Sequence, residues 1–245
     1  MHDSPSEAVA APAKPAIAVA PWWHTGLLVL LLLGGSALNA RQAHRGGLEA
    51  HHLQRYLGGM VAEGLVFLVV WWGLRLRRVS IAELIGARRS LRAWMEDLGV
   101  AGVFWALAVI VLACIGVAAQ LLHLSTPQKT LAALAPNTAA ELFLWIALSV
   151  TAGFVEELTF RGYFLRQFTA PLHAVWLGVV GSSLIFGLSH AYEGAAGMIA
   201  ITVYGALFCG VALLRRSLRP GMIAHAWHDI FSGFMLALAH HFRVI

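Results

Sequence analysis

The chain has 245 residues, of which 59% are hydrophobic and 12% are charged. Soluble domains carry about 25% charged residues, so this composition excludes an ordinary soluble protein and indicates an integral membrane protein. The net charge of +5 does not indicate a nucleic-acid partner, because the basic residues lie at the ends of apolar runs, where they orient helices in a membrane. Since each span needs about 20 apolar residues, we expect an all-α, polytopic helix bundle with about seven or eight transmembrane helices.

Residues 1–20 are rich in Ala and Pro and lack the basic start of a signal peptide, so we predict a disordered tail before a membrane domain at 21–245. Lys and Arg are concentrated on the side of the membrane that holds the N-terminus, which predicts that this end is cytosolic. Residues 75–99 combine arginines with apolar residues at helical spacing, which predicts an amphipathic helix in the membrane interface. Apolar runs predict spans near residues 22–40, 57–74, 99–124, 139–157, 173–190, 195–214 and 220–240.

The two cysteines, Cys114 and Cys209, lie inside apolar runs and form no C-x-x-C pair. A disulfide framework is therefore not expected. We predict that both are buried, small apolar side chains.

Ionisable residues inside the spans are costly, so each is a hypothesis about function. Glu63 and Glu141 lie near predicted span ends, where a solvated or locally paired carboxylate is the simpler interpretation. The others gather in three places: Glu156 with Glu157 and Arg161, then His190, then His225 with His228 and Asp229.

The two adjacent glutamates are expected to differ. On an α-helix Arg161 lies about 40° from Glu157 but about 140° from Glu156. Glu157 and Arg161 can therefore form an ion pair four residues apart. Glu156 lacks this partner and is the candidate general base.

Histidine is the natural complement of such a base. Counted from Pro171 as the pivot of a helical hairpin, Glu156 and His190 lie at nearly the same depth, so we expect them to converge. His225, early in its span, fits this level less well, and His228 lies off the face that His225 shares with Asp229. Each feature alone is often structural, but together they favour a site that holds a water molecule or a metal ion.

Three motifs carry a family resemblance: "EELTFR" (Glu156 to Arg161), "FGLSH" (Phe186 to His190) and "HAWHD" (His225 to Asp229). In this order they resemble the CPBP family of intramembrane proteases, which includes CAAX proteases and bacteriocin-processing (Abi) enzymes. The resemblance covers residues 139–240, the predicted catalytic core. It implies an all-helical membrane enzyme with a cavity open to the cytosol, located in a bacterial inner (plasma) membrane. The implied substrate is a membrane-associated, prenylated or leader-type peptide.

The resemblance also implies roles for single residues. Glu156 resembles the general base, with His190 as its partner in activating water. His225 and Asp229 match the residues that stabilise the oxyanion, and Glu157, Arg161 and Phe186 match supporting positions. Asparagine often occupies the position of Asp229. An aspartate there either donates to the oxyanion when protonated or orients His225.

The cofactor and the function class are left open by the residues. Glu156, His190 and His225 are acceptable zinc ligands, and the family is often described as metalloproteases. The H-E-x-x-H motif is absent, however, and a metal-free glutamate mechanism is also described for this family. One alternative is a proton-coupled transporter. The polar residues cluster in the second half of the chain, which counts against this alternative. Another is a non-catalytic immunity or scaffold protein with the same fold. The expected partners are the lipid bilayer and a peptide or protein substrate.

Overall fold

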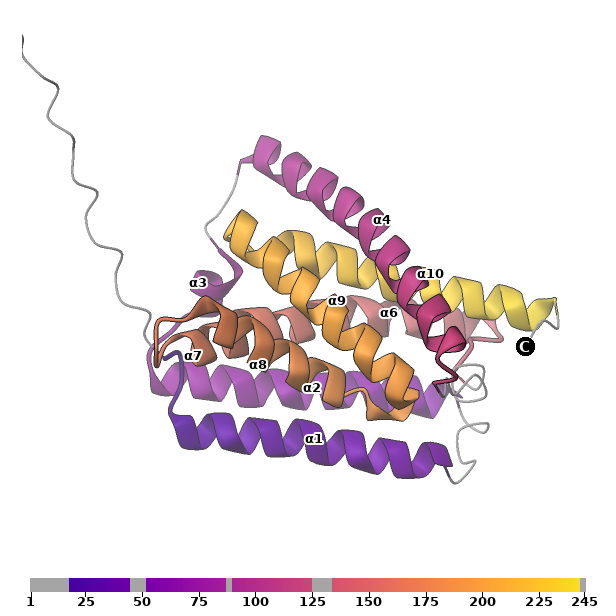
Figure 1. Cartoon of the computed structure of the whole chain (residues 1–245), viewed down its shortest axis with the longest axis horizontal. Coiled ribbons are helices and arrows are strands. Elements are labelled where there is room, and N and C mark those ends of the chain that lie inside the picture. The colour runs from indigo at the N-terminus through magenta and orange to yellow at the C-terminus, as the bar shows by residue number, and fades with distance from the viewer. Residues whose placement is uncertain (1–17, 45–51, 87–89, 125–133, 243–245) are drawn as a thin grey trace, which may run out of the picture.

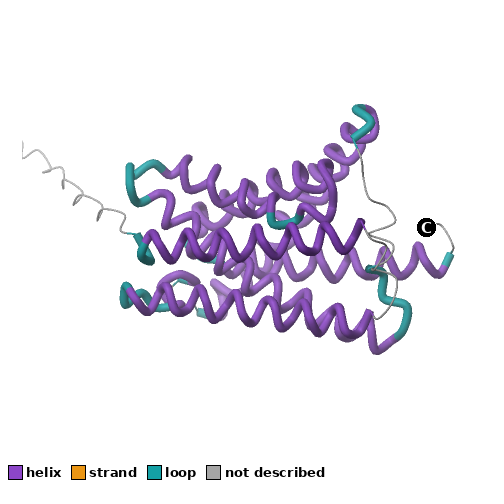
Figure 2. Tube along the Cα trace, turned by 90° about the horizontal axis from the view of Figure 1, so that it is seen from below, coloured by secondary structure: helices purple, strands orange, loops and turns teal. Residues whose placement is uncertain are grey.

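The computed structural model describes residues 18–44, 52–86, 90–124 and 134–242. Within these residues the chain forms helices joined by short turns, and no strand is present (Figure 2). This confirms the predicted all-α class. The helices are α1 (Trp22–His44), α2 (His52–Leu76), α3 (Ile81–Ile85), α4 (Leu91–Leu121), α6 (Ala139–Glu156), the π-helix η1 (Glu157–Phe164), α7 (Leu165–Thr169), α8 (Val175–Leu188), the short 3₁₀ turn η2 (Ala191–Glu193), α9 (Gly194–Arg215) and α10 (Arg219–His241).

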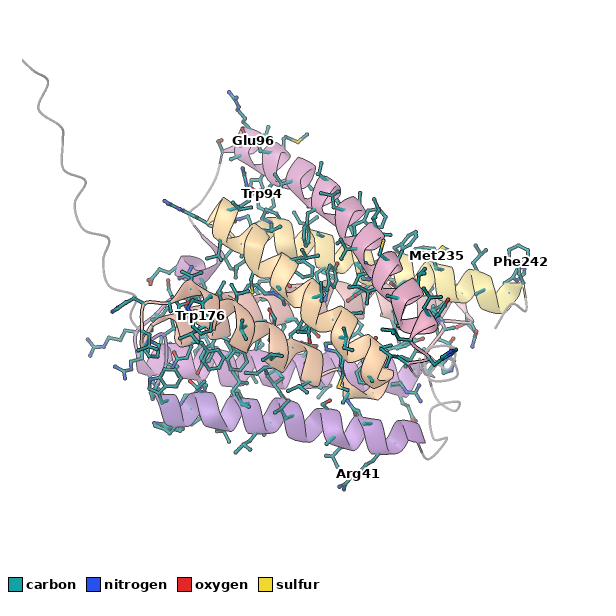
Figure 3. All side chains as sticks on the ribbon, viewed as in Figure 1. Arg41, Trp94, Glu96, Trp176, Met235 and Phe242 are labelled. Atoms are coloured by element: carbon teal, nitrogen blue, oxygen red, sulfur yellow. The ribbon has the colours of Figure 1, made fainter. Side chains whose placement is uncertain are left out.

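Among the residues that the structure describes, five helical segments are long and apolar enough to cross a membrane: Trp22–Gln42, His52–Leu76, Leu91–Leu121, Ala139–Thr169 and Ala191–Arg215. Large apolar side chains face outward from the bundle. Trp176, Met235 and Phe242 project from its periphery (Figure 3), and Trp176 is 64% exposed. So much exposed apolar surface fits a chain surrounded by lipid.

Helix α6 occupies the middle of the bundle and packs between α2 and α10. The contact with α10 is close because Gly153 has no side chain. A Cβ atom at this position would lie 2.9 Å from both the Ala226 backbone nitrogen and the Met222 carbonyl oxygen. Helices α8 and α9 form a second pair, and the tilted α4 packs against α9 and α10 (Figure 1). This arrangement brings the three motif-bearing segments to one region.

The fourth predicted span is longer than expected. The sequence predicts its end near residue 157, but the chain continues as η1 and α7 to Thr169. All eight residues of η1 are buried, including Glu157 and Arg161. The charges that mark the end of an apolar run therefore lie inside the bundle and do not end the helix.

The predicted amphipathic helix at 75–99 does not form as one element. Ser80 caps the five-residue α3, and Ser90 caps α4, each by accepting a backbone N–H bond. These caps start two separate helices, because a serine oxygen satisfies a free N–H of the first turn. Leu84 of α3 is fully buried, so α3 packs onto the bundle.

The predicted tail is shorter than 1–20. Val19 and Ala20 are 5% and 0% exposed and belong to the hydrophobic core. The buried Gln167 side chain accepts from the Ala20 N–H at 3.0 Å and donates to the Ala20 carbonyl at 2.9 Å. The remainder of the predicted tail, 1–17, lies outside the described residues.

The predictions for Glu141 and for the two cysteines can be compared with the structure. Glu141 is locally paired: it completes a capping box with Thr138 and lies 3.5 Å from His52. Both cysteines are free thiols, but only Cys209 is buried, and Cys114 is exposed on the outer face of α4. The prediction of burial for Cys114 was wrong, because an apolar run in a membrane helix also supplies the lipid-facing side.

Candidate active site

The ion pair expected between Glu157 and Arg161 is present and deeply buried. The two side chains are 1% and 0% exposed, and Nη1 of Arg161 lies 3.0 Å from Oε1 of Glu157. The guanidinium carbon lies 4.3 Å from the ring centre of Phe186 and 4.7 Å from that of Phe208. Aromatic faces attract a cation, so the two rings help to keep this charge inside the protein.

The backbone around this pair is a π-helix, which the sequence analysis did not predict. At its end the Leu165 N–H donates to the Phe160 carbonyl, five residues back. The same carbonyl also accepts from Oγ of Ser182 on α8, at 2.7 Å. Single π-helical turns are rare and occur frequently at functional sites. The wider turn still leaves Glu157 and Arg161 in contact.

His225 joins the two glutamates. Its Nδ1 lies 3.0 Å from Oε1 of Glu157, and its Nε2 lies 3.5 Å from Oε2 of Glu156. Asp229, one turn later on α10, approaches the same Nε2 at 3.7 Å. The expectation that His225 fits the level of Glu156 less well than His190 was therefore wrong.

The reason is the register between α6 and α10, which a count along one hairpin does not include. The two helices run antiparallel. Nε1 of Trp145 donates to the Asp229 carbonyl at 2.7 Å, more than three turns before the position where Glu157 meets His225. Gly221 allows this approach, because a Cβ there would lie 2.9 Å from Oε2 of Glu157.

His190 ends α8 with a defined orientation. Its Nδ1 lies 2.9 Å from the Phe186 carbonyl oxygen. Because a carbonyl oxygen only accepts, Nδ1 carries the proton in this contact, and Nε2 keeps a free lone pair. The motif F-x-x-x-H thus serves two purposes: the Phe186 backbone orients His190, while its ring covers the Arg161 cation.

Glu156 and His190 do not touch directly. Among the residues that the structure describes, no hydrogen bond or ion pair joins them. Both lie within electrostatic range of Asp229 and of Glu193. That Glu156 and His190 face each other across a shared space stays a prediction.

Sequence reasoning missed three further residues of this region. Tyr192 and Glu193 follow His190 in the η2 turn, and both interact electrostatically with Glu156. Glu63 of α2 interacts with Glu156, His225 and Asp229 as well. Glu63 therefore faces the site, contrary to the interpretation of a solvated span end. Its position within a long apolar run was the signal that could have identified it.

Exposure separates the polar side chains into two groups. Glu157 and His225 are 1% and 6% exposed, whereas Glu156 and Asp229 are 16% and 30% exposed. The first group is enclosed within the bundle, and the second group keeps part of its side-chain surface exposed.

The described residues do not form a ready-made metal site. No group of three His, Cys, Asp or Glu side chains in the described part of the chain is close enough to hold a metal ion. In particular, Glu156, His190 and His225 do not gather as three ligands of one ion.

A cleft of about 660 Å³ lies elsewhere, near the ends of α3, α7 and α9. Its lining includes Glu83, Arg166 and Arg216, and it reaches inward as far as Arg161. Glu156, His190 and Asp229 are not among its lining residues. The cleft therefore lies apart from these three side chains.

Comparison with known protein families found one match, to the family described as type II CAAX prenyl endopeptidase Rce1-like, over residues 137–231. No curated protein and no solved structure matched the chain. The matched segment runs from the start of α6 into α10 and contains all three motifs, and it supports an intramembrane endopeptidase in general. The family resemblance of the three motifs is thereby confirmed: residues 137–231 match the family described as Rce1-like type II CAAX prenyl endopeptidase.

Proposed function

We propose that this chain is an intramembrane endopeptidase in which Glu156 and His190 activate a water molecule. The observation that carries the proposal is the different setting of the two adjacent glutamates. Glu157 is fully buried and paired with Arg161, whereas Glu156 is 16% exposed and has no cationic arginine or lysine partner in the described residues. A carboxylate that is accessible and not held by a permanent cation is suited to accept a proton.

The reaction follows from these positions. Glu156 takes a proton from water while the water oxygen bonds to the carbonyl carbon of the peptide. Nε2 of His190 accepts a hydrogen bond from the same water and orients it. The carbonyl electrons move to oxygen, and the oxyanion is stabilised by an N–H of His225 and by the O–H of Asp229 in its protonated form. When the C–N bond breaks, Glu156 returns its proton to the leaving amine nitrogen.

Both ring nitrogens of His225 have a part in the proposed stabilisation of the oxyanion. One ring nitrogen contacts the buried Glu157, and the other lies beside Glu156 and Asp229. An N–H on the second nitrogen can donate to the developing oxyanion. The buried ion pair behind it fixes the ring, so that little reorganisation is needed during the reaction.

The proposed substrate is a membrane-associated peptide with a prenylated C-terminus or a leader-type sequence. The site lies within the helix bundle, between α6, α8 and α10, so a substrate must enter from the lipid or from a bundle end. A lipid-modified or apolar peptide meets this requirement. The family match over 137–231 supports the prenylated class.

The decisive experiment compares wild type with Glu156→Gln. Both are purified and reconstituted in liposomes with an internally quenched peptide that ends in a farnesylated CAAX sequence, and with its unprenylated counterpart. Glu156→Gln should accumulate as a folded protein and lose at least 100-fold in kcat, the lower range for a general base. Glu141→Gln is the matched control, because Glu141 serves the capping box at the far end of the same helix. Full activity in Glu156→Gln would exclude the proposed base.

A search for the natural substrate uses the same variant. Peptides and membrane proteins released or retained by cells that produce wild type are compared with those of cells that produce Glu156→Gln. A substrate should accumulate uncleaved with the variant. An unchanged set of proteins, together with no cleavage of either peptide, would favour a non-catalytic scaffold.

A further inference from the structure

Glu63 lies outside the matched family segment, yet the helix register brings it to the site. Helices α2 and α6 pack side by side, and two ring contacts fix their alignment. The ring centres of Tyr56 and Trp145 are 5.6 Å apart, and those of Phe67 and Phe154 are 6.1 Å apart. The second contact lies later than the first along both α2 and α6, so the two helices run parallel. Glu63 therefore lies at a level between Trp145 and Phe154.

Glu63 is also on the correct face of α2. At about 100° per residue, it lies about 20° from Tyr56 and about 40° from Phe67 around the helix axis. Both of those residues contact α6, so Glu63 points toward the same neighbour. Interpolation between the two ring contacts puts Glu63 level with residue 151 of α6, about one and a half turns, or 8 Å, before Glu156 along the helix axis.

The electrostatic neighbours of Glu63 agree with this register. Its carboxyl group interacts electrostatically with Glu156, His225 and Asp229, and the strongest of these interactions is with Glu156. Oε2 of Glu156 is buried, lies 3.5 Å from Nε2 of His225, and makes no hydrogen bond among the described residues. Glu156 therefore has room for an orienting partner from α2.

We propose that Glu63 is a positioning residue of the candidate active site, which contacts the Glu156 carboxyl group from α2 and fixes its orientation. This inference rests on the proposed function, because it assigns Glu63 a role through Glu156. Two ionised carboxylates at this separation repel each other. When one of them is protonated, its O–H donates to the other, and the pair becomes a hydrogen bond. An orienting partner of this kind typically changes activity 10- to 100-fold.

The role predicts different results for two substitutions. Glu63→Leu removes every donor and should lower kcat at least tenfold, with KM nearly unchanged, since Glu63 does not touch the substrate. Glu63→Gln keeps an N–H that can donate to Glu156 and should retain most of the activity. The farnesylated CAAX peptide serves as substrate, and Glu141→Gln is the control. A Glu63→Leu enzyme with wild-type kcat would overturn the proposal, as would a loss confined to KM.

A second measurement needs no substrate. Thermal unfolding in detergent is recorded for wild type, Glu63→Leu, Glu156→Leu and the double variant. If the two side chains are in contact, the change in melting temperature of the double variant should differ from the sum of the single changes. An additive result would overturn the contact between Glu63 and Glu156.

The two measurements separate this inference from the proposed function. If Glu156→Gln retains full activity while the thermal cycle is non-additive, the proposed general base fails although the contact exists. If Glu156→Gln is inactive while Glu63→Leu is fully active, the proposed function stands and the positioning role of Glu63 is overturned.

Discussion

The buried pair of Glu157 and Arg161 gives the strongest prediction for stability. The perturbation is Arg161→Met, which keeps a long apolar side chain and removes the charge. At 3.0 Å the two charges attract each other by about 5 kcal/mol if the effective dielectric constant is about 20. Most of this gain offsets the cost of burying both ions, so it is not the net contribution of the pair.

Removing only one partner has a larger effect than removing both. In Arg161→Met the Glu157 carboxylate is left buried without its cation, which typically costs about 3–5 kcal/mol. The loss of the contacts with Phe186 and Phe208 adds to this. The double variant Glu157→Leu with Arg161→Met should recover much of the stability, because neither charge is then buried alone.

Unfolding in detergent with a chemical denaturant measures these differences. Arg92→Met is the matched control, since Arg92 and Glu96 form an ion pair with the same spacing at 3.3 Å. Their side chains are 90% and 49% exposed, so water already solvates both, and little change is expected. Equal stability of Arg161→Met and wild type would refute the reasoning, and so would a double variant that is less stable than Arg161→Met.

Three further variants test other parts of the structure. Asp229→Asn should keep activity within about tenfold of wild type, because an amide can donate to the oxyanion. A loss of activity as large as that of Glu156→Gln would instead show that the carboxylate is needed to orient His225. Gly153→Ala should destabilise the protein by about 1–3 kcal/mol in the same unfolding assay, because the added Cβ meets backbone atoms of α10. Gly34→Ala is the control: a Cβ at Gly34 has no atom within 4 Å, so this variant should be neutral or slightly stabilising. Gln167→Leu leaves the N–H and carbonyl of Ala20 unsatisfied and should cost about 2 kcal/mol or more, with faster proteolysis before α1 as the readout.

The fold class could be predicted from the sequence because the pattern of apolar runs is strong and local. Helices are present at all seven predicted spans, but only five helical segments of the described residues are long and apolar enough to cross a membrane. The boundary errors lie where a charge was taken as the end of an apolar run. Arg161 is the clearest example. A buried arginine is tolerated when a carboxylate and aromatic rings surround it, and those partners come from η1, α8 and α9. Partners on other helices are not visible in a window of 20 residues.

The candidate site was predictable to the extent that its contacts are local. The pairing of Glu157 with Arg161 follows from a spacing of four residues, and the same is true of Phe186 with His190. The contact of His225 with both glutamates depends on the register of α10 against α6, which residue counts do not fix. Glu63 was misinterpreted for the same reason, since its neighbours lie on helices far from it in sequence.

The adjacent glutamates have a physical explanation once this register is known. Arg161, Glu157, His225 and Glu156 follow one another at 3.0, 3.0 and 3.5 Å, so each negative group has a basic neighbour. Arg161, at the buried end of this series, supplies a fixed positive charge. Glu156, at the other end, is the more exposed carboxylate. Two consecutive residues are needed because one side chain cannot both hold His225 from inside the protein and receive a proton at the surface of the site. On this reasoning Arg161→Met should lower kcat as well as stability, while Glu156→Gln should lower kcat with little loss of stability, and measuring both quantities for both variants distinguishes the two positions.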